Sequence, residues 1–243
     1  MNFFQELITD INNVFIDGAR WKWLFQGLGK TLLITLFSVL IGVAIGVVVA
    51  AVRSTYDKNE ESLRKNGGAG FWVLRSLNGL CRLYLTVVRG TPVVVQLLIA
   101  YFVIFASSRN ELAVAVFAFG INSGAYVAEI FRAGIMSIDN GQFEAGRSLG
   151  FNYFQTMIYI VIPQVIKAVL PTLCSEFIVL LKETSVAGYV GIMDLTKAGE
   201  LIRGRTFSAF LPLLAVAIIY LVVVIILSKL VNVLERRLRR SER

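Results

Sequence analysis

One acidic side chain, Glu129, lies inside an apolar segment of this sequence, and its position needs a physical reason. Glu129 falls within the apolar stretch 111–133, where an ionised carboxylate costs about 2.5–3.5 kcal/mol if that stretch spans a bilayer. Asn122 and Tyr126 precede it at helical spacing, so the three lie near one face of a helix. Two interpretations are open: this face lines a solute path, or Glu129 lies near the cytoplasmic end and pairs with Arg132.

Catalytic and nucleotide-binding arrangements are not found. The chain has no histidine, and its two cysteines, Cys81 and Cys174, lie far apart in apolar surroundings typical of buried thiols. The run Gly29-Lys30-Thr31 imitates the end of a P-loop, but Leu24 occupies the position of the required first glycine and no strand precedes it. The sequence therefore predicts a protein that is not an enzyme, with no metal site and no bound cofactor.

The composition indicates an integral membrane protein. Of the 243 residues 56% are hydrophobic, and the mean hydropathy is +0.72, above the roughly 45–50% apolar content of soluble domains. The net charge is +8, but the basic residues concentrate beside apolar runs. Anionic lipid headgroups and membrane orientation explain this charge better than nucleic acid does.

We expect an all-α fold with about five transmembrane helices in a membrane domain over residues 27–232. The five expected spans are residues 27–52, 91–108, 111–133, 157–181 and 207–230. Residues 1–26 read as an amphipathic interfacial segment. The basic tail 233–243 is predicted to be cytoplasmic by the positive-inside rule, which with five spans places the N-terminus outside.

Three connecting segments carry further expectations. Residues 53–75, charged and ending near a glycine pair, read as an exposed, mobile cytoplasmic loop. Residues 71–88 suit a helix lying at the membrane interface. Residues 182–206 mix charged and apolar side chains and read as a re-entrant segment.

The connection 139–156 has the signals of two short helices. Asp139 or Asn140 can cap the first helix, and Asn152 can cap the second. Glu144 is expected in the first turn, where its charge suits the helix dipole. Gly150 can end the first helix in a left-handed turn. Two short helices at the surface of an apolar domain are therefore predicted, and Gly146 and Gly150 leave room for another backbone or another protein to approach closely.

This connection resembles the EAA loop of ATP-binding-cassette (ABC) importer permeases. The family pattern appears as Glu144-Ala145-Gly146, then Gly150, then Ile160 to Pro163, with Gly146 and Ile162 as mild departures. In that family the loop forms a cytoplasmic coupling helix that docks on an ATPase subunit. The resemblance implies an ATPase-coupling role for six residues: Asp139, Glu144, Ala145, Gly146, Leu149 and Gly150.

Two further stretches resemble the polar amino acid branch of these type I permeases. They are the string 84–92 with Gln96 and the string 122–135, and the likeness continues at Lys182 to Ser185. A zwitterionic solute needs both hydrogen-bond donors and acceptors, and seven residues supply them: Asn122, Ser123, Tyr126, Glu129, Glu183, Thr184 and Ser185. The resemblance implies uptake of a polar or cationic amino acid across the bacterial cell membrane.

The resemblance also implies partners. They are an ABC ATPase dimer carrying ATP and Mg²⁺, a second permease subunit that is either a copy or a paralogue, and an extracytoplasmic substrate-binding protein. Membrane lipid surrounds the chain, and nucleic acid is not expected. The alternative is a secondary transporter or solute channel not powered by ATP, although no convincing internal repeat supports the former.

Overall fold

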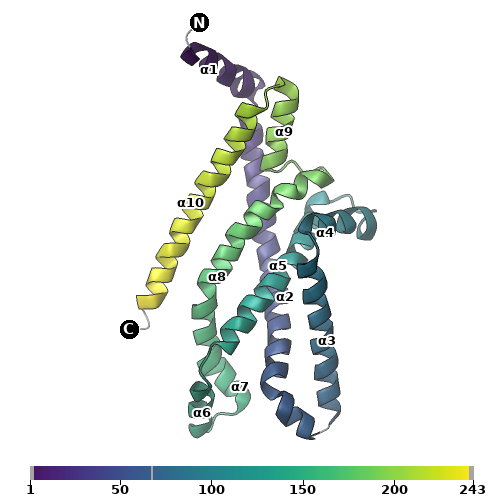
Figure 1. The fold of residues 1–243 in the computed structure, drawn as a ribbon, viewed down its shortest axis with the longest axis vertical. Helices are drawn as coiled ribbons and strands as arrows, with labels where there is room; N and C mark the ends of the chain where they lie inside the picture. Colours follow the sequence, from purple (N-terminus) through teal and green to yellow (C-terminus); the bar gives the residue numbers. More distant parts are fainter. Residues whose placement is uncertain (1–2, 67, 241–243) are drawn as a thin grey trace. The chain divides into compact units, whose positions relative to one another are not determined.

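The computed structural model describes residues 3–66 and 68–240, and within these ranges the chain is helical with no strand (Figure 1). The α-helices are α1 (Phe3–Ile11), α2 (Trp21–Asn66), α3 (Ala69–Gly90), α4 (Val93–Ile99), α5 (Glu111–Met136), α6 (Asn140–Ser148), α7 (Tyr153–Thr156), α8 (Ile162–Glu183), α9 (Leu195–Thr206) and α10 (Phe210–Arg240). The π-helical and 3-10 segments are Asn12–Ile16, Asp17–Ala19, Ala100–Ile104, Met157–Val161 and Thr184–Val190. The all-α prediction is confirmed.

Among the described residues, four helical segments are long and apolar enough to cross a membrane, or five if one bent pair counts as a span. The four are Trp21–Lys58, Glu111–Met136, Tyr153–Val190 and Phe210–Leu238. They correspond to the first, third, fourth and fifth predicted spans. The sides of the membrane on which the termini lie stay predictions.

The prediction that residues 53–75 form a mobile loop is wrong. Helix α2 continues without interruption to Asn66, and α3 begins at Ala69. The charged residues between 53 and 66 include good helix formers and no glycine or proline, so a helix leaving an apolar environment has no reason to stop. Gly68 provides the extended backbone that precedes α3.

The predicted second span, 91–108, is also wrong as a single helix. Helix α4 has only 7 residues and is followed by a 5-residue π-helical turn, Ala100–Ile104, whereas a spanning helix needs about 20. It forms a bent pair with α3, at an angle of 107°. Thr91 is extended, as expected for a residue before a proline, and this is where the bend begins.

The other expected boundaries need smaller changes. Helix α10 runs on to Arg240, so the described part of the basic tail is helical rather than a separate segment. Within 182–206 the chain forms the 3-10 helix Thr184–Val190, a left-handed turn at Gly191 and then α9. Near the N-terminus, α1 ends at Ile11 and the first spanning helix starts at Trp21, six residues earlier than expected.

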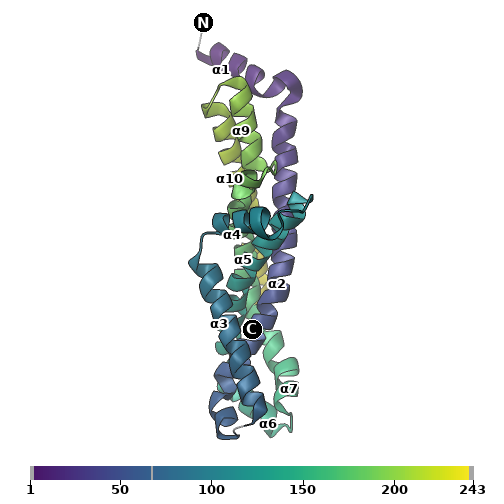
Figure 2. The same ribbon diagram turned by 90° about the vertical axis from the view of Figure 1, so that its right-hand side faces the viewer.

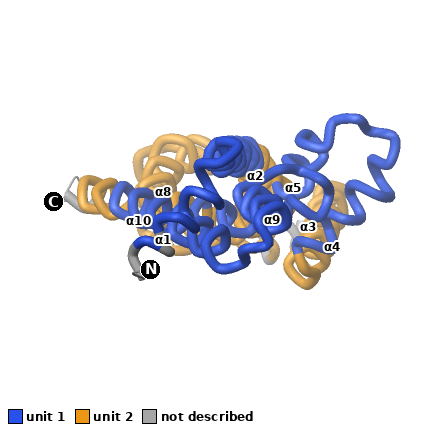
Figure 3. Tube along the Cα trace, turned by 90° about the horizontal axis from the view of Figure 1, so that it is seen from above, with its two compact units in different colours: residues 1–38, 93–119, 177–230 blue, residues 39–92, 120–176, 231–243 orange. Residues whose placement is uncertain are grey.

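The chain divides into two compact units, described separately and coloured in Figure 3. Unit 1 contains residues 1–38, 93–119 and 177–230, and unit 2 contains residues 39–92, 120–176 and 231–243. Helices α2, α5, α8 and α10 each contribute residues to both units.

Unit 1 is organised where α2 meets the start of α9. The buried cluster contains Leu24 of α2 and Leu195, Ala198 and Ile202 of α9. Gly27 makes this approach possible, because a β-carbon there would lie 2.6 Å from the backbone oxygen of Asp194. Buried groups at this contact find hydrogen-bond partners, as expected: the Leu195 amide donates to the Thr31 hydroxyl at 3.2 Å.

Unit 2 is organised around the close packing of α2 on α5. Gly42 and Gly46 form the GxxxG motif of the first span, and β-carbons added there would lie 2.7 Å from the Ser123 Oγ and 2.5 Å from Val127 Cγ1. Small residues thus let the two backbones approach. Helix α3, whose course is clear in Figure 2, adds Leu85 and Val88 to a buried cluster with Val49 of α2 and with Ala125 and Ala128 of α5.

Candidate functional site

The connection 139–156 folds into two capped helices, as predicted. Asp139 is the N-cap of α6 and its side chain accepts from the Gly141 amide at 2.6 Å. Asn152 caps α7 in a capping box, in which the Asn152 and Gln155 side chains each accept from the other's backbone amide at 2.9 Å. Gly150, with φ +82°, makes the turn between the helices. The caps define where each short helix begins, and Phe143 of α6 packs in a buried cluster with Ile135 and Val161.

Most of the predicted coupling residues face outward from this connection. Asp139, Glu144, Ala145, Leu149 and Gly150 are exposed, and Leu149 retains 72% of its accessible surface. Nothing lies within 4 Å of a β-carbon built at Gly150, so this turn is open to a partner.

One detail of the predicted connection is wrong, and at Gly146 the structure favours one of the two alternatives left open by the sequence. Helix α6 starts at Asn140, so Glu144 is its fifth residue and lies beyond the first turn. Gly146 is buried, and a β-carbon there would lie 2.6 Å from the Thr156 hydroxyl oxygen. The glycine is therefore needed for packing α6 against α7 and not for the approach of another protein.

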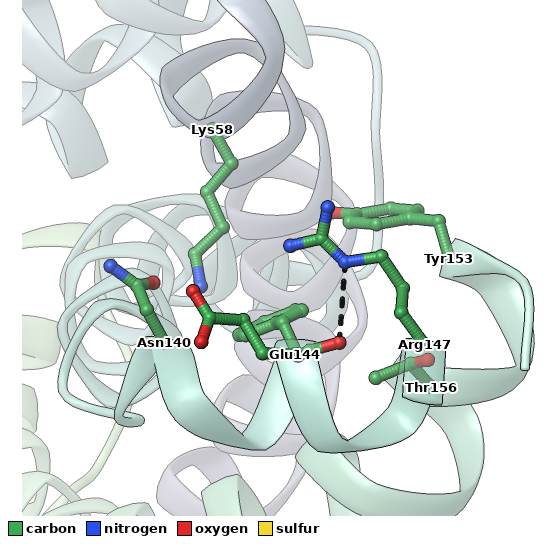
Figure 4. A pocket seen from close by; sticks show the side chains of 7 residues that line it. Lys58, Asn140, Glu144, Arg147, Tyr153 and Thr156 are labelled. Carbon is green, nitrogen blue, oxygen red and sulfur yellow. Dashed lines mark hydrogen bonds between the residues drawn. The ribbon is translucent and has the colours of Figure 1, made fainter. Parts of the chain in front are cut away.

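A hollow of about 560 Å³ lies directly beside this connection in unit 2 (Figure 4). Its lining residues are Lys58, Asn140, Phe143, Glu144, Arg147, Tyr153 and Thr156. Lys58 reaches it from α2, with its ammonium nitrogen 3.7 Å from the centre of the Phe143 ring. Phe143 in turn stacks on Tyr153, with ring centres 6.4 Å apart. The end of α2 thus contacts α6, the helix that carries Glu144, through Lys58 and Phe143.

Glu129 belongs to a network of charges rather than standing alone. It pairs with Arg53 of α2 and with Arg132 one turn later in α5, the latter at 3.1 Å. Arg132 also pairs with Asp57 at 3.5 Å. The pairing with Arg132 was one of the two interpretations open from the sequence, and the structure adds Arg53 and Asp57. A carboxylate already shared by two guanidinium groups is held in place by its own chain.

The other predicted pathway residues of α5 differ in exposure. Asn122 and Ser123 are buried, and Ser123 packs against Gly42. Tyr126 is half-buried, and the Arg89 guanidinium lies 5.6 Å from its ring centre. In this structure Ser123 serves helix packing, whereas the ring of Tyr126 lies close to the charged side chain of Arg89.

The predicted residues after the fourth span lie in unit 1. Thr184 is fully buried and donates its hydroxyl to the Leu181 carbonyl at 2.8 Å. Glu183 is half-buried at the end of α8. Ser185 lines two small hollows of about 250 and 270 Å³ together with Thr196. Of this group, Ser185 is the residue placed at an open cavity.

Sequence reasoning missed three residues of unit 2: Arg53, Asp57 and Lys58. They were assigned to a mobile loop. Their spacing was the available signal, because Arg53 and Asp57 are four residues apart on one face of a helix. Reading the charged stretch as a helical continuation of the first span would have found them.

Comparisons with known proteins identify the family to which this chain belongs. Residues 68–240 match the family described as "Binding-protein-dependent transport system inner membrane component". The match covers most of the chain, and the chain belongs to this family. It is accordingly a non-catalytic, membrane-embedded component of a bacterial transport system.

Similar proteins with names indicate the kind of transport system within this family. The chain is similar to the glutamine transport system permease protein GlnP of Escherichia coli (strain K12), at 36% identity over 175 residues, covering 70% of this chain and 78% of that protein. It is 37% identical over 158 residues to a putative glutamine permease GlnP of Rickettsia typhi, covering 64% of this chain and 72% of that protein.

Two solved structures are similar to this chain. The crystal structure of an amino acid ABC transporter with histidines has a TM-score of 0.78 and 37% identity, covering 92% of this chain and 98% of that one. An inward-facing structure of the MetNI methionine ABC transporter has a TM-score of 0.69 at 19% identity, covering 90% and 96%, and shows the shared fold. The predicted ABC importer permease fold is confirmed.

Proposed function

We propose that this chain is the permease subunit that moves an amino acid through an ATP-driven importer, and that its 139–156 connection is the contact with the ATPase. The observation that carries the proposal is the form of this connection. It presents Glu144, Ala145 and Leu149 outward from two capped helices, with an open left-handed turn at Gly150. A capped surface helix with an exposed leucine suits docking in a groove on another protein.

The names of the relatives support amino acids as the solute class. Glutamine appears in the names of the similar permeases, and an amino acid transporter is among the similar structures. Accessible polar side chains of this kind occur in each unit, Tyr126 in unit 2 and Glu183 and Ser185 in unit 1, and a zwitterion needs both donors and acceptors. We propose a polar or cationic amino acid as the cargo.

The proposed mechanism is alternating access driven from outside the chain. A binding protein delivers the solute to two permease subunits, the second being either another copy or a paralogue. Two ATPase subunits, which hold ATP and Mg²⁺, move together and carry the 139–156 connections with them. Nucleotide state then changes the relative free energy of two packings of the permease helices.

Substrate-stimulated ATP hydrolysis tests the proposal. The permease is co-purified with its ATPase and reconstituted in liposomes, and hydrolysis is measured with the binding protein and each amino acid in turn. Stimulation by one or a few polar or cationic amino acids is the expected result. Absence of a co-purifying ATPase, or solute transport that is independent of ATP, would overturn it.

A single substitution tests the role of the connection itself. Gly150→Asp adds a side chain at a positive φ and a charge on the proposed docking surface, and should abolish stimulated hydrolysis while the complex still inserts. Gly68→Asp is the matched control, because Gly68 is exposed with open space around it and precedes α3, where aspartate is a favourable N-cap. Normal stimulation in the Gly150→Asp complex would count against docking here.

A further inference from the structure

A second hollow in unit 2 has three arginines among its seven lining residues. Its volume is about 430 Å³, and its charged lining consists of Arg53, Arg82, Arg89 and Glu129. These side chains come from three helices, α2, α3 and α5. The hollow is separate from the one beside the 139–156 connection and shares no lining residue with it.

The charges at this hollow do not balance. Arg53, Glu129, Arg132 and Asp57 form a connected set of two cations and two anions, which is neutral. Arg82 and Arg89 then contribute two positive charges that no described acidic side chain pairs with in a salt bridge. The hollow therefore carries a net charge of +2 and favours an anion.

The hydrogen-bond donors at the hollow are also incompletely used. The Arg53 Nε is buried and has no hydrogen-bond partner among the described residues. Arg82 and Arg89 are exposed and lie seven residues apart on α3, which is two helical turns on one face. Guanidinium groups in such an arrangement bind phosphate or carboxylate oxygens through several N–H groups at once.

The surroundings favour a lipid over a soluble anion. A neighbouring face of α3 is apolar and exposed at Leu80, Leu83 and Val87, with 63%, 60% and 53% of their surfaces accessible. Arg53 directly follows the apolar run 27–52, so it lies at the end of the hydrocarbon-spanning part of α2. Basic groups at this level on the cytoplasmic side meet anionic headgroups.

We propose that this hollow binds the phosphate of an anionic phospholipid. Arg82 and Arg89 contact the phosphate oxygens, and Arg53 offers its unused Nε. The acyl chains lie along the apolar face at Leu83 and Val87. The proposal depends on the chain being in a membrane and not on the solute or on the ATPase contact.

Native mass spectrometry of the delipidated, purified full chain in detergent tests this proposal. The probes are dioleoyl phosphatidylglycerol and, as the uncharged comparison, dioleoyl phosphatidylcholine. Because one basic residue near an anionic lipid surface contributes about 1 kcal/mol, Arg82→Gln and Arg89→Gln should each weaken phosphatidylglycerol binding about 5-fold, and the double variant about 25-fold. Phosphatidylcholine binding should not change.

Two controls separate a built site from general attraction. Arg75→Gln removes one exposed positive charge from the same face of α3, but Arg75 does not line the hollow, so this variant should bind like the wild type. Arg82→Lys keeps the charge and should retain most of the binding.

Three results would overturn the proposal. The first is equal binding of the two lipids, and the second is an equal loss of binding in Arg75→Gln. The third is displacement of phosphatidylglycerol by an equal concentration of inorganic phosphate or of a free amino acid, which would assign the hollow to a soluble anion or to the solute.

Discussion

The ammonium nitrogen of Lys58 lies 3.7 Å from the centre of the Phe143 ring and has no hydrogen-bond partner among the described residues. Lys58 belongs to the end of α2, and Phe143 is a buried residue of α6, the helix that carries Glu144. A desolvated cation over an aromatic ring contributes about 2 kcal/mol. This contact connects the first spanning helix to the proposed ATPase-docking surface.

Loss of the Lys58 charge should weaken coupling. Lys58→Met keeps the length of the side chain but removes the cation, so α6 is held less firmly and substrate-stimulated ATP hydrolysis should fall several-fold. Lys58→Arg retains a cation over the ring and should preserve stimulation. Hydrolysis is measured in proteoliposomes with and without substrate and binding protein. Equal behaviour of the two variants would show that the positive charge of Lys58 over the Phe143 ring does not matter for coupling.

Removal of the Glu129 carboxylate should destabilise the protein even without solute. Glu129→Gln leaves Arg53 and Arg132 close together without their shared anion, at a cost of about 1–3 kcal/mol. Thermal unfolding of the detergent-purified chain measures this loss. The control is Glu200→Gln, which breaks the more exposed Lys197–Glu200 pair and should cost less than about 1 kcal/mol.

Uptake measurements separate the two roles left open for Glu129. If the residue is structural, uptake of labelled arginine should fall only in proportion to the amount of folded Glu129→Gln complex. A selective loss of arginine uptake, with glutamine uptake retained, would instead assign Glu129 to the solute path.

The fold and the candidate site were predictable to different extents. The apolar runs and the caps of the 139–156 connection are local signals, so Asp139, Gly150 and Asn152 were assigned correctly. The path of residues 53–66 was not, because charged residues are compatible with both a solvated helix and a loop. The packing of Ser123 against Gly42 was not predictable for another reason: only tertiary structure brings these two residues together.

Two neighbouring glycines of α2 should respond differently to the same substitution. Gly27→Ala places a β-carbon against the Asp194 backbone oxygen, a contact that a flexible side chain cannot relieve, and should destabilise by about 1–3 kcal/mol. Gly29 has nothing within 4 Å, so Gly29→Ala should be neutral or stabilise the helix by up to about 1 kcal/mol. The apparent Tm of each variant in detergent measures the difference, and equal effects would contradict the packing.

The stability of the protein should depend on pH through Asp194. This residue caps α9 from a fully buried position, and burial raises the pKa of its carboxyl to about 6, despite the amide hydrogen bonds that it accepts from Thr196 and Lys197. The folded state therefore binds more protons than the unfolded state between the ordinary pKa and about 6. Stability should fall as pH rises through this window, by at most about 1.4 kcal/mol per pH unit.

Asp194→Asn isolates this effect. The amide side chain still caps the helix but does not ionise, so the Tm difference between pH 4.5 and 7 should become smaller than in the wild type. Unfolding in detergent at both pH values provides the measurement. An unchanged difference would show that Asp194 does not titrate in this range.

The most direct test of the ATPase contact is site-specific photo-crosslinking in the reconstituted complex. A photoreactive residue replaces Leu149, which is 72% exposed in the proposed docking surface, or Val103, which is 71% exposed in unit 1 and serves as the matched position. We expect a crosslink to the ATPase from position 149 and none from position 103. No crosslink from position 149, or a crosslink from it only to lipid or to the extracytoplasmic binding protein, would contradict it.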